Sequence, residues 1–497
     1  MTSQSATEPS GKSRVPVNAA LLSSSQFART VIGFVFFLFL ARWLGPEDYG
    51  KYMFAFAFSE IFSILGDFGL HEYTIREMSR RPRELRERLA GVLGLKTALS
   101  SFSALLMIAL LPFLGKDPTT SLAVAAFAVA QIGYSWFYST TIAYSVRQDL
   151  HIQAFLWLLE KAVFAAAGVA LLLAGRSFLA VAFSHTAVQF GGGALSVWLV
   201  WKKYGPFRIA LDRERWRGYL KAALPFGLIV AFYLVYFRID SVMISFFRGD
   251  EEVGLYNGAY NLISALMFLP SGLVAALFPR LAGAFRRPTD NLDGPFQRAS
   301  RWLLAMSVPM AVGGSLLARE ITQMLLGETY LPAALALAVL SWTLPVWFIT
   351  FLQGNLLTII ERQKAVAVVG AVNMAANVAL NLIVIPRYGF TGAAATTLAT
   401  EIIGLTQMFW LLKRNISLTR TAWLSLKVAA VALVMGGLIL VLKGRLHPAA
   451  IIAAAAVFYA VAVTVLRVVD PGDLKMIFTR RAAPEEAVDM QPPSASV

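Results

Sequence analysis

The chain has 497 residues, of which 57% are hydrophobic and only 15% carry a charged side chain. Soluble domains carry about 25% charged residues, so this composition predicts a protein that crosses a membrane many times. The net charge of +15 does not point to nucleic acid, because Lys and Arg gather in the cytoplasmic loops of membrane proteins. Without cysteine or a nucleotide motif, we expect no cofactor, no metal and no nucleic-acid partner.

Apolar runs along the chain predict an all-α polytopic membrane protein with about fourteen transmembrane helices. The predicted parts are a disordered cytoplasmic N-terminus (1–17), a first six-helix lobe (18–201), a basic cytoplasmic linker (202–221), a second six-helix lobe (222–414), a C-terminal helix pair (420–467) and a disordered cytoplasmic tail (468–497). The linker is expected to lie on anionic lipid.

The distribution of Lys and Arg tests this topology. With the N-terminus inside, 31 of the 44 fall in segments predicted to be cytoplasmic and nine fall in external loops. Missing a single span would have reversed the alternation after it. The asymmetry therefore supports the number of spans and predicts that both termini are cytoplasmic.

A short motif recurs in the two predicted lobes. Residues 45–52 read GPEDYGKY, and residues 249–256, 204 positions later, read GDEEVGLY. Both copies connect two apolar segments at a predicted external turn. Such a repeat predicts two structurally similar halves, a plan that is common in transporters.

Four cations lie inside predicted spans: Arg29, Lys96, Lys161 and Arg238. At about 1.5 Å per residue, Arg29 and Lys161 lie near the midplane of the membrane. Lys96 lies nearer the cytoplasmic face and Arg238 nearer the outer face. Because an ionisable group at such depth costs about 3 kcal/mol or more, it marks a functional site by default.

Several segments, in the same order along the chain, resemble one family. They are LARWLGPEDYGKY with GDFGL near the start, then RIDSVMISFFRGDEEVGLYNGAYNLI, ALFPRLAGAF and NLIVIPRYGFTGAAATTLATE. The set resembles bacterial polysaccharide flippases of the O-antigen (Wzx) type. These belong to the multidrug/oligosaccharidyl-lipid/polysaccharide exporter superfamily, with the drug and toxin exporters and the lipid II flippase. The resemblance covers about residues 18–414.

The resemblance implies two MATE-like, pseudo-symmetric six-helix lobes around a central cavity that opens alternately to each side of the membrane. It implies a transporter, not an enzyme, in the bacterial inner membrane. Its substrate would be an undecaprenyl-pyrophosphate-linked oligosaccharide for surface polysaccharide such as the O-antigen of lipopolysaccharide. Membrane lipids, a polysaccharide polymerase and glycosyltransferases are the implied partners.

Such a substrate needs cations for its pyrophosphate. The four intramembrane cations are the candidates, and Arg29 resembles an essential arginine in the first span of lipid II flippases. A structural alternative stays open, in which the cations only neutralise carboxylates and Glu60 pairs with Arg29. In the eleventh span, Asn373, Asn377 and Asn381 share one helix face, where they would bind sugar hydroxyls or join helices by hydrogen bonds.

Four intramembrane carboxylates are candidates for ion coupling: Glu60, Asp67, Asp240 and Glu401. A carboxylate in the membrane can exchange a proton or bind Na⁺, although simple ion pairing with neighbouring helices is the alternative. Two other functions remain open. An ion-coupled multidrug exporter would share the fold, whereas short external loops disfavour a membrane-embedded glycosyltransferase or polymerase.

Overall fold

The computed structural model describes residues 15–81, 84–206, 213–284 and 292–469, and this described part contains helices and no strand. It confirms the predicted all-α class. Most of the predicted disordered termini and the centre of the basic linker lie outside the described residues.

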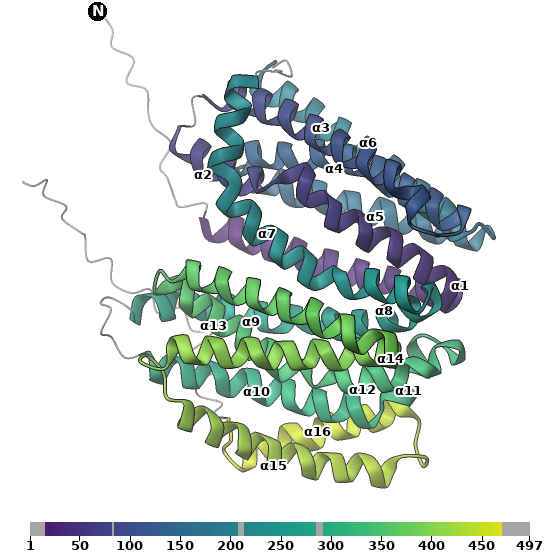
Figure 1. Cartoon of the computed structure of the whole chain (residues 1–497). Helices are drawn as coiled ribbons and strands as arrows, with labels where there is room; N and C mark the ends of the chain where they lie inside the picture. Colours follow the sequence, from purple (N-terminus) through teal and green to yellow (C-terminus); the bar gives the residue numbers. More distant parts are fainter. Residues whose placement is uncertain (1–14, 82–83, 207–212, 285–291, 470–497) are drawn as a thin grey trace, which may run out of the picture.

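The helices of the first lobe pack into one bundle (Figure 1). They are α1 (Val15–Asp67), α2 (Leu70–Arg80), α3 (Leu85–Leu110), α4 (Pro118–Val146), α5 (Leu150–Leu173) and α6 (Phe178–Tyr204). Between α3 and α4 lies the short 3-10 helix η2 (Leu111–Phe113). The core of this lobe is apolar, and α4 packs along both α3 and α6.

The second lobe lies against the first through α7 and α8, both of which contact α1. Its helices are α7 (Arg213–Phe247), α8 (Asp250–Ser264), η3 (Ala265–Met267), α9 (Phe268–Ala284), α10 (Asp293–Leu316), α11 (Ala318–Leu325), η4 (Glu328–Ala333), α12 (Ala334–Ser341), α13 (Thr343–Ile359) and α14 (Gln363–Leu412). The added pair, α15 (Leu418–Leu442) and α16 (Pro448–Val465), packs on α10 at the far edge (Figure 1).

Two helices are long enough to cross the membrane twice. α1 has 53 residues and α14 has 50, which at 1.5 Å per residue would measure about 75 Å or more if straight, against a hydrocarbon core of about 30 Å. Each contains one non-helical glycine, Gly45 in α1 and Gly389 in α14, where the chain turns back. The expected external turn at Gly45 is therefore reduced to a kink between two spans.

The described residues contain ten helices long and apolar enough to cross a membrane, or twelve when each bent helix pair is one span. Counting α1 and α14 as two spans each gives fourteen, as predicted. The sequence did not predict the breaks within spans. α10 and α11 meet at 82°, and α2 follows a break at Phe68 and Gly69, both of which have positive φ.

The two related turns meet each other at one end of the molecule. Gly45 and Gly249 have nearly the same backbone angles, with φ 73°, ψ 172° and φ 99°, ψ 173°. A methyl group on Gly50 would lie 1.7 Å from the carbonyl oxygen of Asp250, and one on Gly254 would lie 1.8 Å from that of Pro46. Since 50 and 254, like 46 and 250, are equivalent positions of the repeat, the contact is reciprocal, as across an internal two-fold axis.

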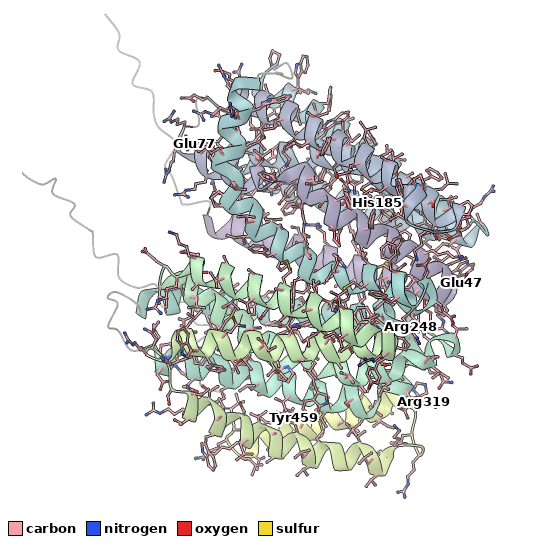
Figure 2. The ribbon with its side chains drawn as sticks, viewed as in Figure 1. Glu47, Glu77, His185, Arg248, Arg319 and Tyr459 are labelled. Carbon is pink, nitrogen blue, oxygen red and sulfur yellow. The ribbon has the colours of Figure 1, made fainter. Side chains whose placement is uncertain are left out.

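Side chains strengthen this closed end. Lys116, from the loop before α4, lies 2.9 Å from a carboxylate oxygen of Asp250. The Tyr330 hydroxyl donates a hydrogen bond of 3.0 Å to the Ala41 carbonyl. In Figure 2, Glu47 and Arg248, beside the two turns, lie at the same end of the molecule, and Glu77 lies at the opposite end. The lobes are thus joined at the end predicted to be external.

Candidate functional site

A cavity of about 1520 Å³ lies between the two lobes. Its walls come from α1, α4, α5, α7, α8, η3, α9, α13 and α14. It reaches Ser145 and Thr358 at the Glu77 end of the helices, and no described residue of the two related turns lines it. Pockets for drug-sized ligands measure about 300–1000 Å³, so this cavity has room for a larger molecule.

A second, smaller recess of about 360 Å³ adjoins the main cavity. The two spaces share Thr30, Arg238, Asn261 and Ser264 in their walls. The recess is also lined by Lys161, which makes no ion pair or hydrogen bond within the described part of the chain. The Lys161 side chain lies against Gly33, where a methyl group would come within 3.0 Å of its Cε atom. Glu160 lines the same recess and acts electrostatically on Lys161 without a direct ion pair. Lys161 is therefore a cation without a direct ion pair in the wall of the recess.

Arg29 lies beside the main cavity on α1. Its guanidinium lies 4.8 Å from the centre of the Trp157 ring, and its Nη1 donates a hydrogen bond of 3.3 Å to Gln26. Trp157 and Gln26 both line the cavity. Within the described residues no carboxylate comes within 4 Å of Arg29, so its charge is balanced by no direct ion pair.

The expected partner of Arg29 was wrong. Glu60 instead forms an ion pair with Arg238 of the other lobe, because its side chain lies on the face of α1 that packs against α7. Arg238 also lies 5.3 Å from the centre of the Phe56 ring. Glu60 and Arg238 both line the main cavity, where they join its two walls.

Lys96 and Asp67 neutralise each other away from the cavity. The Lys96 amine is 2.6 Å from an Asp67 oxygen, and the Lys96 side chain is only 1% exposed. The amine also lies 4.9 Å from the centre of the Tyr138 ring. Neither Lys96 nor Asp67 is among the described residues that line the main cavity or the recess. This geometry therefore gives no support to a substrate role for Lys96 or an ion-coupling role for Asp67.

Asp240 is the centre of a buried polar cluster in the second lobe. One carboxylate oxygen accepts hydrogen bonds from the Tyr256 hydroxyl at 2.6 Å and the Thr397 hydroxyl at 3.0 Å. The other accepts from the Asn381 amide at 2.6 Å, and the same amide donates to Asn377 at 3.1 Å. No cationic side chain lies within 4 Å of Asp240 in the described residues.

The cluster offers oxygen atoms from three helices around one carboxylate. The Asn381 side-chain oxygen is buried and has no partner within the described structure. Oxygen ligands from carboxylate, amide and hydroxyl groups suit hard cations, and one carboxylate balances one positive charge. This arrangement can hold a proton or a small monovalent cation.

Glu401 and Asn373 belong to the main cavity instead. Glu401 is 7% exposed and accepts a hydrogen bond of 2.8 Å from the Tyr236 hydroxyl. The Asn373 oxygen accepts one of 3.2 Å from Gln407. Both residues line the cavity, while Asn377 does not. The predicted asparagine stripe is therefore divided between the cavity and the Asp240 cluster.

Sequence reasoning missed Tyr236, Tyr256 and Thr397, the hydroxyl partners of these carboxylates. A signal was present. Thr396, Thr397 and Thr400 interrupt an apolar run beside Glu401, and such polar groups inside a span need partners.

Comparison with known proteins places this geometry among transporters. A family model described as polysaccharide biosynthesis protein matches residues 17–285, and one described as lipid II flippase MurJ matches residues 195–459. The probable flippase AglR of Haloferax volcanii is 25% identical over 34% of this chain, and the match covers only 36% of AglR.

Two solved structures share the fold. One is the lipid II flippase MurJ in an inward closed conformation, with a TM-score of 0.76, 14% identity, and coverage of 92% of this chain and 100% of that one. The other is an inward-facing MATE family transporter of the MOP superfamily, with a TM-score of 0.59, 13% identity, and coverage of 78% and 94%. Since the first family model spans more than half of the sequence, the chain belongs to the polysaccharide biosynthesis protein family.

Proposed function

We propose that the protein flips a lipid-linked oligosaccharide, joined to its lipid through pyrophosphate, across the bacterial inner membrane by alternating access. The observation that carries the proposal is the pair of cations that make no direct ion pair, Arg29 and Lys161, beside a cavity between two lobes. The carboxylates that act on them at longer range, Glu160 and Glu60, leave one positive charge in excess once Arg238 is counted. A buried cation is tolerated only with a compensating anion. A pyrophosphate that enters the cavity would be that anion, and undecaprenyl is the lipid that the family resemblance implies.

The closed contact between the turns supports an inward-facing state. The cavity extends to the end predicted to be cytoplasmic and stops below Gly50 and Gly254. Transport would then require the lobes to separate at the turns and to close at the other end. Both termini would be cytoplasmic, and the protein would act as a transporter between the glycosyltransferases that build the glycan and the polymerase that extends it.

We infer that ion coupling uses Asp240. Of the four predicted coupling carboxylates, Glu60 pairs with Arg238 and Asp67 with Lys96, so their charges are already balanced. Asp240 and Glu401 both lack a cationic partner within the described residues, but Asp240 has three side chains converging on it and the unpartnered Asn381 oxygen beside it. Binding of H⁺ or Na⁺ there would stabilise the state in which Asn381, Thr397 and Tyr256 converge on the carboxylate, and so would bias the conformational equilibrium.

Arg29 provides the test. In vesicles containing the purified protein, we expect Arg29→Ala to abolish flipping of a fluorescent short-chain polyprenyl-pyrophosphoryl N-acetylglucosamine, because the phosphate loses its cation. Arg29→Lys should restore only part, since an ammonium cannot form the two parallel hydrogen bonds of a guanidinium. Lys427→Ala, on the lipid-facing helix α15, is the matched control and should flip normally.

Full flipping by Arg29→Ala would contradict the pyrophosphate role. Transport of a cationic drug by the wild-type protein, with no transport of the pyrophosphate probe, would favour a multidrug exporter of the same fold.

A further inference from the structure

The two walls of the cavity differ in chemistry. Two cations that make no direct ion pair, Arg29 beside the main cavity and Lys161 in the recess, come from α1 and α5 of the first lobe. The opposite wall, from α7, α13 and α14, is lined by amides, hydroxyls, aromatic rings, the carboxylate Glu401 and the cation Arg238. Arg238 is paired with Glu60 of the first lobe, so the cations that make no direct ion pair lie on the first-lobe side. Such a division fits a ligand with one anionic end and one uncharged, hydrogen-bonding end.

Glu401 is the unexpected group on the second wall. Its carboxylate makes no ion pair within the described structure and is oriented by the Tyr236 hydroxyl, which is itself 3.1 Å from the Thr400 hydroxyl. A carboxylate repels a phosphate, so Glu401 is unsuited to the anionic end of the ligand. It is suited to accept hydrogen bonds from hydroxyl groups, as ionised carboxylates accept and cannot donate.

Asn373 supplies the complementary donor. Gln407 donates to its oxygen, which fixes the amide orientation and leaves the Asn373 nitrogen as a donor. That nitrogen lies where a methyl group on Gly404 would be only 2.3 Å away. Gly404, three positions after Glu401 on α14, also lines the cavity. The missing side chain of Gly404 thus makes room for the amide beside the carboxylate.

Tyr233 adds an aromatic surface to the same wall. It lines the cavity, the residue is 61% exposed, and its ring centre lies 4.5 Å from that of Phe237. Tyr233 and Tyr236 are three positions apart on α7, so they lie on one side of that helix. An exposed ring held by a second ring offers a flat apolar face at little cost in side-chain entropy.

We propose that Glu401, Asn373 and Tyr233 form a saccharide-binding wall, which takes the first sugars of the substrate while its pyrophosphate lies at the cations of the first lobe. This inference rests on the proposed function. Pyranose rings present adjacent hydroxyls to a carboxylate and an amide, and their C–H faces to an aromatic ring. A wall built for hydroxyls also discriminates strongly against a ligand without them, because its polar groups would stay unpaired.

Binding to two soluble probes tests the inference. They are farnesyl pyrophosphate, which has no sugar, and farnesyl-pyrophosphoryl N-acetylglucosamine, each titrated against purified protein. We expect the wild type to bind the sugar-bearing probe about tenfold more tightly, as one hydrogen bond to a charged group would provide. Glu401→Gln and Tyr233→Leu should remove this difference and leave the affinity for farnesyl pyrophosphate unchanged, which also shows that the variants fold.

Two controls separate this inference from the proposed function. Arg29→Ala should weaken both probes equally, and Glu328→Gln, at the closed end, should weaken neither. The saccharide wall would be overturned if the wild type bound the two probes equally, both with N-acetylglucosamine and with galactose as the sugar. The proposed function would not be affected by that result. An equal loss for both probes in Glu401→Gln would also overturn the saccharide wall. Binding of neither probe by the wild type would overturn the proposed function and this inference together.

Discussion

The two related turns share a backbone and differ in what their side chains contact. In the first turn, Lys51 pairs with Glu47 on the surface, 2.9 Å away, where the Glu47 side chain is 70% exposed. In the second turn, Asp250 pairs with Lys116 where both side chains are about 10% exposed. An exposed pair contributes little to stability, whereas breaking a buried one is costly.

The difference continues into the helices that follow. Tyr52 and Tyr256 are equivalent positions in the repeat, 204 residues apart. The Tyr52 ring packs edge-on against Phe127. The Tyr256 hydroxyl instead donates to Asp240. The shared glycines therefore close the end predicted to be external, while among the described residues only the second turn connects this closure to the candidate ion site.

Substituting the shared glycines should have the largest effect. A methyl group at Gly50 or Gly254 would overlap a carbonyl oxygen of the other turn. Overpacking of this kind destabilises the closed contact by about 2 kcal/mol. The conformational equilibrium should therefore shift toward the outward-open state roughly thirtyfold. Because the chain has no cysteine, a single cysteine at Ser264 in the cavity reports the state. We expect Gly50→Ala and Gly254→Ala to increase its labelling by a membrane-impermeant reagent added outside.

The matched control is Gly437→Ala on α15, where nothing lies within 4 Å of the added methyl group. Its labelling should equal that of the unsubstituted protein. Unchanged labelling in both turn variants would show that the reciprocal contact is not the gate.

The two equivalent tyrosines should differ in ion dependence. Tyr256→Phe removes a hydrogen bond to a carboxylate, worth about 1.5–3 kcal/mol, so the concentration of Na⁺ or H⁺ that raises the melting temperature should change by about tenfold or more. Tyr52→Phe should leave it unchanged. Asp240→Asn should abolish the ion effect altogether. Equal behaviour of the two tyrosine variants would separate the second turn from ion binding.

Breaking the buried pair Asp250–Lys116 should open the turns more than breaking the exposed pair Glu47–Lys51. Asp250→Asn leaves Lys116 buried over the Phe54 ring, 4.8 Å away, although its amine keeps hydrogen bonds to Ser245. The change should therefore destabilise the closed end by about 1.5 kcal/mol. External labelling at Ser264 should rise, and less than in the glycine variants. Glu47→Gln, which breaks the exposed pair, should change labelling by less than twofold. A larger effect of Glu47→Gln would reverse the comparison.

The features that depend on local sequence pattern, the spans and the turns, could be predicted from the sequence. Apolar length and Lys and Arg counts predicted the fourteen spans, and the eight-residue repeat identified the two turns that meet. The partners of buried charges depend on how helices approach each other across long chain separations. The sequence therefore suggested Arg29 as a possible partner of Glu60, whereas the partner is Arg238, 178 residues away. The contact of Asn381 with Asp240, at a separation of 141 residues, was missed.

The smallest effect is expected at Asp117, next to the Lys116 that holds the second turn. Asp117 precedes α4 and accepts hydrogen bonds from the backbone amides of Thr119 at 3.1 Å and Thr120 at 3.3 Å. Burial raises the pKa of the Asp117 carboxyl, but hydrogen bonds from these two residues outweigh it and lower the pKa to about 2. The stabilisation is therefore present above the ordinary pKa of about 3.9 and is lost as pH falls toward 2. Asp117→Ala should lower the free energy of unfolding by about 1 kcal/mol at pH 7. In unfolding measurements this difference from the wild type should disappear near pH 2. A difference that persists at that pH would assign the effect to packing.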